Sequence, residues 1–195
     1  MDTVAALSEY AEAKVLRIIV LSACPKTVDN DLMVTDHCPG YGSAAKFIAN
    51  TALQTWLDVN VYTREEVFVL ETMGRDAGWL AASACLSGIV DLAVLPEEVF
   101  DKEIFLDEVR KSIKEKNKCY VVVSEGARYA DGTYLAAGEA KNDGFGHAIL
   151  GGAGNAVKNL ILDSGAAKRV KSSGLIDGSA LPCHRSVVYR CGRIV

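Results

Sequence analysis

The sequence predicts an α/β protein in which helices cover both faces of a mostly parallel sheet. Short apolar runs typical of strands alternate along the chain with longer segments of helical spacing. Strands that are apolar throughout are typical of parallel sheets, because helices bury both of their faces. The 195 residues, 50% hydrophobic and 24% charged, are enough to form such a core and exclude a disordered or fibrous protein.

The first elements surround a long polar loop. Amphipathic spacing predicts a helix around residues 4–11, and the apolar run 16–21 predicts a buried strand. A loop rich in Pro, Asp and Gly follows over residues 22–41. Ser43 can cap the next helix, which reaches about residue 57, and residues 67–70 form another strand.

The remaining elements continue this alternation. Small residues predict a helix over 77–87, begun by Asp76 and ended by Gly88. Further helices are expected over residues 101–116 and 152–164, and further strands over residues 89–95 and 120–123.

Composition and charge exclude several kinds of partner. The formal net charge of −4 leaves no basic field for nucleic acid or for an acidic membrane surface. The longest apolar runs are too short for a membrane span, and the first residues do not form a secretory signal. The six cysteines form no CxxC pair, which favours a reducing compartment. We therefore expect a soluble, cytoplasmic protein that binds neither nucleic acid nor membranes.

The long loop is also the natural boundary between two lobes. We expect residues 1–42 to be the remnant of one lobe, residues 43–170 to form an α/β lobe, and residues 171–195 to form an irregular tail. Ligands of open α/β sheets bind in crevices next to the carboxyl ends of the strands. A site is therefore expected where this loop follows a strand.

Polar residues directly follow the strand predicted at residues 16–21. Asp29 and Asp31 can divide the tasks of proton acceptor and metal ligand. Lys26 can neutralise phosphate charge as a point cation. Pro, Asn and Asp are also turn formers, so a simple turn over residues 25–31 is an equally good interpretation.

A glycine-rich segment offers a different possibility. Residues 40–45, Gly-Tyr-Gly-Ser-Ala-Ala, match the G-x-G-x-x-A form of a dinucleotide fingerprint. That fingerprint begins immediately after a strand, whereas residues 36–39 intervene here, so a nucleotide-binding oxidoreductase is a less favoured hypothesis. His37 has no second His or Cys at ligand spacing, which favours a structural role over metal binding.

Two further strand ends carry polar residues. Met73, Gly74 and Arg75 follow one predicted strand, where glycine permits close approach of a ligand and arginine can bind a phosphate or sugar oxygen. Glu125 follows another strand, a position where an isolated Glu would usually be a solvated loop acid. Because parallel strands end at the same edge of a sheet, Asp29, Arg75 and Glu125 are expected to lie near one another.

These segments together resemble the phosphofructokinase family, and in particular its pyrophosphate-dependent branch. Residues 25–31, 35–45, 73–80 and 124–126 match the family's motifs in order and at suitable distances. The similarity covers about residues 1–169. Lys26 before Thr27 resembles the pyrophosphate-dependent members, since ATP-dependent bacterial members more often have Gly there. The resemblance implies an incomplete, phosphofructokinase-like α/β fold.

The resemblance also implies a reaction, in which pyrophosphate or ATP phosphorylates the 1-hydroxyl of fructose 6-phosphate to give fructose 1,6-bisphosphate in glycolysis. Asp29 would take the hydroxyl proton, and Lys26 would stabilise the transferring phosphate. Mg²⁺ would be the cofactor, held in part by Asp31, and the intact parent would be a homo-oligomer. The sugar phosphate would be bound by Thr27, Val28, Asp29, Met73, Gly74, Arg75 and Glu125.

The chain departs from the family's pattern in three places. In the family, a Gly-Gly-Asp loop that binds the phosphoryl donor and magnesium stands just before the stretch that residues 1–7 match. This sequence has no match to that loop. Residues 174–178 replace a Tyr/Leu-x-Gln-Arg motif that binds the sugar phosphate, and the basic tail 182–195 is compatible with a frameshift. Glu66 stands where an arginine often reaches a neighbouring subunit's sugar site. We therefore expect a fragment with little activity alone, or alternatively a non-catalytic sugar-phosphate-binding module.

Overall fold

The computed structural model describes residues 2–14, 24, 27–136 and 152–174. Its four parallel strands form one sheet in the order β2-β3-β1-β4. The strands are β1 (Glu66–Thr72), β2 (Leu92–Val94), β3 (Lys118–Ser124) and β4 (Val170–Gly174). The helices are α1 (Asp2–Ala13), α2 (Tyr41–Asn60), α3 (Trp79–Ala84), α4 (Lys102–Lys116) and α5 (Ala153–Asp163), and the short 3₁₀ helix Cys85–Ser87 extends α3.

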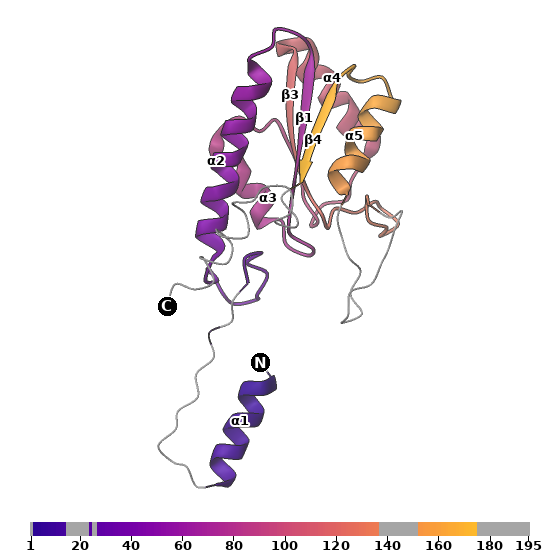
Figure 1. Cartoon of the computed structure of the whole chain (residues 1–195). Coiled ribbons are helices and arrows are strands. Elements are labelled where there is room, and N and C mark those ends of the chain that lie inside the picture. The colour runs from indigo at the N-terminus through magenta and orange to yellow at the C-terminus, as the bar shows by residue number, and fades with distance from the viewer. Residues whose placement is uncertain (1, 15–23, 25–26, 137–151, 175–195) are drawn as a thin grey trace.

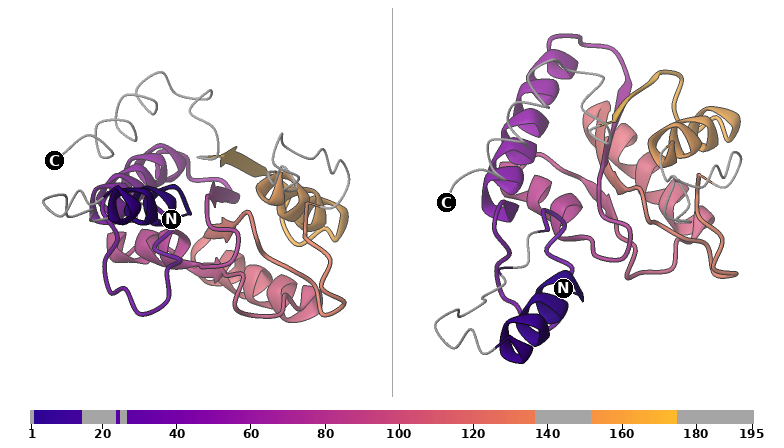
Figure 2. Two further views of the ribbon diagram at one scale, coloured as in Figure 1. Left: turned by 90° about the horizontal axis from the view of Figure 1, so that it is seen from below. Right: turned by 60° about the horizontal axis from the view of Figure 1, so that its bottom comes forward.

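Helices cover both faces of the sheet (Figures 1 and 2). Successive side chains of β1 and β3 point to opposite faces, so each strand contributes to two cores. One core packs α2 and α3 against Phe68, Leu70, Tyr120 and Val122. The other packs α4 and α5 against Val67, Val69, Val121 and Val123. Both faces of the central strands are therefore buried, and the predicted fold class is confirmed.

Most of the predicted elements are present with shifted bounds. The strand predicted at residues 89–95 spans only Leu92–Val94. The chain enters it at Asp91, whose carboxylate accepts a hydrogen bond from the Tyr120 N–H at 2.8 Å. The helix predicted from residue 77 begins at Trp79, directly after Gly78, whose N–H donates to a carboxylate oxygen of Glu97 at 2.7 Å. The strand predicted at residues 16–21 lies outside the described residues.

Residues 171–174, expected in an irregular tail, form most of strand β4 instead. The strand has the sequence Val-Lys-Ser-Ser-Gly, whose single apolar side chain carries no strand pattern. It forms because β1 presents an edge for pairing, in a parallel register that runs from Val67↔Val170 to Glu71↔Gly174. The predicted boundary between residues 170 and 171 therefore falls inside β4, whereas the boundary between residues 42 and 43 stays a prediction. The rest of the tail lies outside the described residues.

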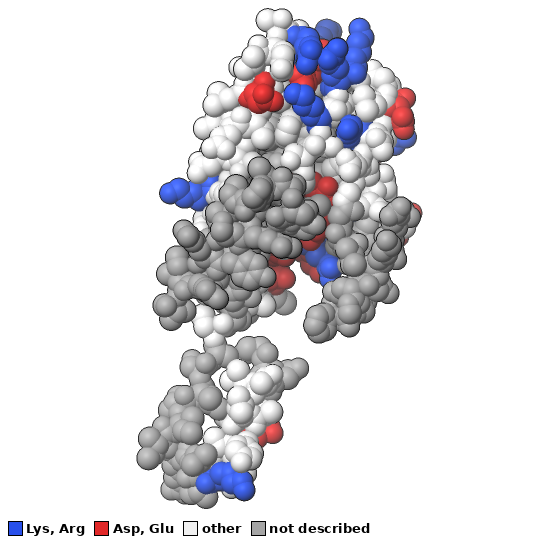
Figure 3. Space-filling view, viewed as in Figure 1, with Lys and Arg blue, Asp and Glu red and all other residues white. Residues whose placement is uncertain are grey.

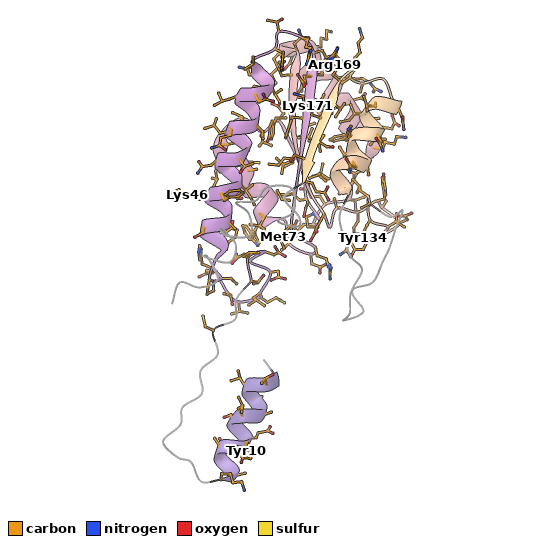
Figure 4. All side chains as sticks on the ribbon, in the orientation of Figure 1. Tyr10, Lys46, Met73, Tyr134, Arg169 and Lys171 are labelled. Carbon is orange, nitrogen blue, oxygen red and sulfur yellow. The ribbon has the colours of Figure 1, made fainter. Side chains whose placement is uncertain are left out.

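The amino-terminal ends of the strands are rich in charge. Lys and Arg side chains gather there, at the top of Figure 3, and Arg169 and Lys171 lie at this end in Figure 4. Glu66 is buried beneath them, with its carboxylate 3.1 Å from the Lys171 ammonium and 3.8 Å from Arg64 Nε. Met73 lies at the opposite end of the sheet (Figure 4). In this chain, Glu66 therefore belongs to an ion-pair cluster remote from Met73.

Helix α1 lies apart from the sheet in Figure 1. Its Leu7 and Tyr10 side chains are exposed. Of the helices in the described residues, α1 included, none combines the length and the apolarity needed to cross a membrane.

Candidate functional site

The candidate site lies at the carboxyl ends of β1 and β3. Thr72 and Ser124 end these two strands and are paired directly in the parallel register. The chain continues from them into Met73 and Glu125, so the two segments singled out in the sequence emerge side by side. This edge of a parallel sheet is where open α/β folds place their ligands.

Backbone hydrogen bonds join the two segments closely. The Glu125 N–H donates to the Thr72 carbonyl at 3.0 Å, and the Gly126 N–H donates to the Gly74 carbonyl at 3.2 Å. The Ser124 hydroxyl also donates to the Gly74 carbonyl. Gly74 has a φ of 125°, a conformation that residues with a Cβ rarely adopt. The loop geometry therefore requires glycine at this position.

Asp29 reaches the site from a loop that is anchored at two points. The Val28 side chain is buried in the core formed by α2 and α3. Asn30, in a left-handed conformation with φ 57°, accepts a hydrogen bond from the Cys38 N–H at 2.8 Å and donates to the Asp36 carbonyl at 3.2 Å. Asn tolerates this conformation better than most residues. Both neighbours of Asp29 thus hold its backbone in place.

The charges of Asp29 and Arg75 both act on the Glu125 carboxyl at this edge of the sheet. Burial raises the pKa of Glu125 to about 7, and the negative charge of Asp29 adds to this rise. The Gly74 N–H and the Arg75 guanidinium oppose it. Charge interactions of this kind require the groups to lie close together. The structure therefore brings together the acid, the guanidinium and the second acid that the strand ends predicted to meet.

The other predicted site residues differ in how far they are buried and in what they contact. Thr27 is half-buried, and its hydroxyl accepts a hydrogen bond from the Asp29 N–H at 3.2 Å. Because the Val28 side chain lies in the core, any contact of Val28 with a ligand would use its backbone. Asp31 is exposed. Within the described residues, no group of three or more His, Cys, Asp or Glu side chains could hold a metal ion. Lys26 lies outside the described residues.

The glycine-rich segment at residues 40–45 does not have the context of a dinucleotide site. Gly40 has a φ of 96° and precedes the first turn of α2, so the rest of the segment is already helical. Residues 36–39 before it include one bend and one turn residue and no strand. A dinucleotide fingerprint requires strand, turn and helix in succession. The segment is therefore a helix start on a loop.

Glu71 is a structural residue of the site that the sequence analysis missed. Its buried carboxylate accepts hydrogen bonds from the N–H groups of Gly152, Ala153 and Gly154, at 2.8, 3.0 and 2.9 Å. These N–H groups form the start of α5, where backbone donors have no partner within the helix. Burial raises the pKa of Glu71, and the three N–H groups lower it. The only signal in the sequence is a charged residue directly after the apolar run 67–70.

We expect Glu71→Gln to destabilise the fold by about 1–3 kcal/mol, because the amide NH₂ cannot accept the α5 N–H groups and buried donors lose their partners. Urea unfolding of the two proteins at pH 7 measures this difference. Glu115→Gln, on the exposed side of α4, is the matched control and should change stability by less than about 0.5 kcal/mol. Equal effects of the two substitutions would contradict the role of Glu71.

Comparisons with known proteins show which family this chain resembles. The family model "Phosphofructokinase" matches residues 1–185. A pyrophosphate–fructose 6-phosphate 1-phosphotransferase from Halomonas elongata is 46% identical over 144 residues, which are 70% of this chain and 34% of that protein. An ATP-dependent 6-phosphofructokinase from Nostoc is 34% identical over 178 residues, 89% of this chain and 48% of that protein.

A solved structure of a phosphofructokinase also matches this chain. The crystal structure of a pyrophosphate-dependent phosphofructokinase from Marinobacter aquaeolei matches with a TM-score of 0.71 and 31% identity, over 97% of this chain and 46% of that one. The chain thus spans between about a third and a half of the length of these relatives. The matching family model, the sequence relatives and the shared fold establish that this chain belongs to the phosphofructokinase family.

Proposed function

We propose that this chain forms the sugar-phosphate-binding part of a phosphofructokinase. The reaction would transfer a phosphoryl group from pyrophosphate, or from ATP, to the 1-hydroxyl of fructose 6-phosphate, giving fructose 1,6-bisphosphate in glycolysis in the cytoplasm. The convergence of Asp29, Arg75 and Glu125 at one sheet edge is the observation that carries this proposal. Relatives that are pyrophosphate–fructose 6-phosphate 1-phosphotransferases, 44–46% identical to this chain, favour pyrophosphate as the donor.

Each of these side chains suits one task in such a transfer. The Asp29 carboxylate would accept the proton of the attacking hydroxyl. The Arg75 guanidinium would bind phosphate oxygens through its fork of N–H donors. With a pKa of about 7, the Glu125 carboxyl is part-protonated near neutral pH, so it would both donate and accept hydrogen bonds with sugar hydroxyls. Phosphoryl transfer depends mainly on such positioning and charge stabilisation.

Magnesium fits the acidic residues of the Asp29 loop only partly. Mg²⁺ is commonly bound by one or two carboxylates together with phosphates and water. Asp31, which is exposed, would contribute one carboxylate to it. When bound, Mg²⁺ would offset negative charge on the phosphate oxygens.

A non-catalytic sugar-phosphate-binding module is the second candidate. The observation in its favour is that Asp29, Arg75 and Glu125 suit the binding of a sugar phosphate whether or not a phosphoryl donor is present. In such a module the Asp29 carboxylate would have no donor to act with. We therefore expect the chain alone to show little turnover with fructose 6-phosphate, pyrophosphate and Mg²⁺, whereas an intact parent, which we expect to be a homo-oligomer, would be active.

We expect the chain to bind fructose 6-phosphate and Arg75→Ala to weaken that binding at least about tenfold, because a charge-assisted contact to phosphate is lost. Isothermal titration calorimetry measures the affinity, and a coupled assay with pyrophosphate and Mg²⁺ measures turnover. Arg110→Ala is the control, since Arg110 lies on α4 and pairs with the exposed Asp107. Equal affinities of the wild type and Arg75→Ala would contradict the site. Turnover at ordinary rates would rule out the module.

A further inference from the structure

A groove beside one edge of the sheet is separate from the residues of the candidate site. Its volume is about 230 Å³, and it lies between β2, the loop after β2 and the first turns of α4. Small-molecule sites usually measure about 300–1,000 Å³, so this groove is better matched to a few peptide side chains. Its floor includes the buried Phe100 and Phe105, and on its rim Val99 and Ile104 are each 66% exposed.

The groove runs along a strand edge that is open to pairing. In the part of the chain that the structure describes, β2 pairs with β3 alone. Consecutive residues 92–95 all line the groove, although neighbouring side chains of a strand point to opposite faces. The groove therefore follows the edge of the strand and not one of its faces.

The backbone of β2 also has hydrogen-bonding groups at this edge. The register pairs Leu92 with Val121 and Val94 with Val123, which directs the N–H and C=O groups of Leu92 and Val94 toward β3. Because successive residues of a strand direct these groups to alternate sides, those of Ala93 point away from β3, toward the open edge. An open edge of this kind can pair with another extended chain.

The charged residues that line the groove are all acidic. They are Glu98, Asp101 and Glu108, and all three are exposed. Glu108 also lies 3.3 Å from Lys111 on the same helix, but exposed pairs of this kind contribute little and can be displaced by an incoming cation. Complementary charge therefore favours a basic partner over an acidic one.

We propose that this groove binds an extended peptide segment with alternating apolar and basic side chains, which adds to the edge of β2 as a further strand. Apolar side chains would lie between Val99 and Ile104, and basic side chains would face Glu98 and Glu108. Because β2 spans only Leu92–Val94, few backbone hydrogen bonds can form and the complex would be weak and reversible. This surface does not depend on the proposed sugar-phosphate function.

The first test uses three fluorescently labelled hexapeptides and the full chain, with binding followed by fluorescence anisotropy. One alternates Lys and Val, one alternates Glu and Val, and one repeats the Lys-Val sequence with methyl groups on alternate backbone nitrogens. We expect the Lys-Val peptide to bind at least about tenfold more tightly than the other two, because one lacks the complementary charge and the other lacks backbone donors. Equal binding of the Lys-Val peptide and either of the other two peptides would overturn the proposal.

The second test changes the protein. The double substitution Glu98→Lys and Glu108→Lys should weaken binding of the Lys-Val peptide at least about tenfold, whereas Glu115→Lys, on the same helix but away from the groove, should change it less than about twofold. Thermal unfolding confirms that each variant is folded. Self-association of the wild type that the double substitution abolishes would place a second copy in the groove and overturn the proposal.

Discussion

Replacing Glu125 with glutamine is expected to stabilise the protein by roughly 2 kcal/mol at pH 8 and to have little effect at pH 5. The pKa of Glu125 is raised from 4.5 to about 7, chiefly by burial and then by the charge of Asp29. Between these two values the folded state holds more protons than the unfolded state, so stability falls as pH rises through this range. The full shift corresponds to roughly 3 kcal/mol, and solvent screening reduces it.

Urea unfolding of the wild type and Glu125→Gln at pH 5, 6.5 and 8 checks this expectation. The wild type should lose stability as the pH rises, relative to the variant, because glutamine carries no charge to bury. Glu115→Gln provides the control for removing an exposed carboxylate and should show no such divergence. If the difference between wild type and Glu125→Gln were constant over this range, Glu125 would titrate as an ordinary surface acid.

Gly126→Ala is expected to destabilise the protein by roughly 3 kcal/mol and to disturb the site at the same time. A Cβ at Gly126 would lie 1.8 Å from the Arg75 carbonyl oxygen and 2.5 Å from its carbon. Both atoms belong to the backbone, so the segments after β1 and β3 would have to move apart. That movement would break the hydrogen bond between the Gly126 N–H and the Gly74 carbonyl.

Gly132→Ala separates this collision from ordinary glycine strain. Gly132 has a φ of 82° but nothing lies within 4 Å of its Cβ position, so the alanine there should cost only about 1 kcal/mol. Chemical denaturation gives the two stabilities, and calorimetry with fructose 6-phosphate gives the effect on the site. Similar losses of stability for both variants would show that the close approach of Gly126 to Arg75 is unimportant.

The two expectations describe one property of this sheet edge. Glu125 is buried next to another carboxylate, and Gly126 lets two loops approach more closely than a side chain would allow. Both arrangements lower the free energy of unfolding. Groups with strongly perturbed pKa values concentrate at functional sites, where stability is commonly exchanged for binding or catalysis.

Local patterns in the sequence were sufficient to predict the central strands and the polar residues that follow them. Apolar runs predicted β1 and β3, because both faces of these strands are covered by helices. Asp101 illustrates a helix start that could be read directly, since its carboxylate accepts the N–H groups of Glu103 and Ile104. Once the strands were parallel, Arg75 and Glu125 had to emerge at the same edge.

Local sequence patterns could not predict the features that depend on partners far away in the chain. Strand β4 has one apolar residue and exists because β1 offers an edge to it. Glu71 is a buried charge near the end of β1 that has no apparent reason until the start of α5, more than 80 positions later, supplies three donors. Neither partner can be inferred from the neighbouring residues.

The sequence by itself determined which side chains are available for chemistry, since hydrophobic periodicity and strand-end position are local properties of the chain. The tertiary structure decided how those side chains behave. The raised pKa of Glu125 requires Asp29 to arrive from a separate loop, and the tight contact at Gly126 requires two strand ends to pack against each other. Desolvation and steric fit arise only between segments that folding brings together, which is why no local pattern encodes them.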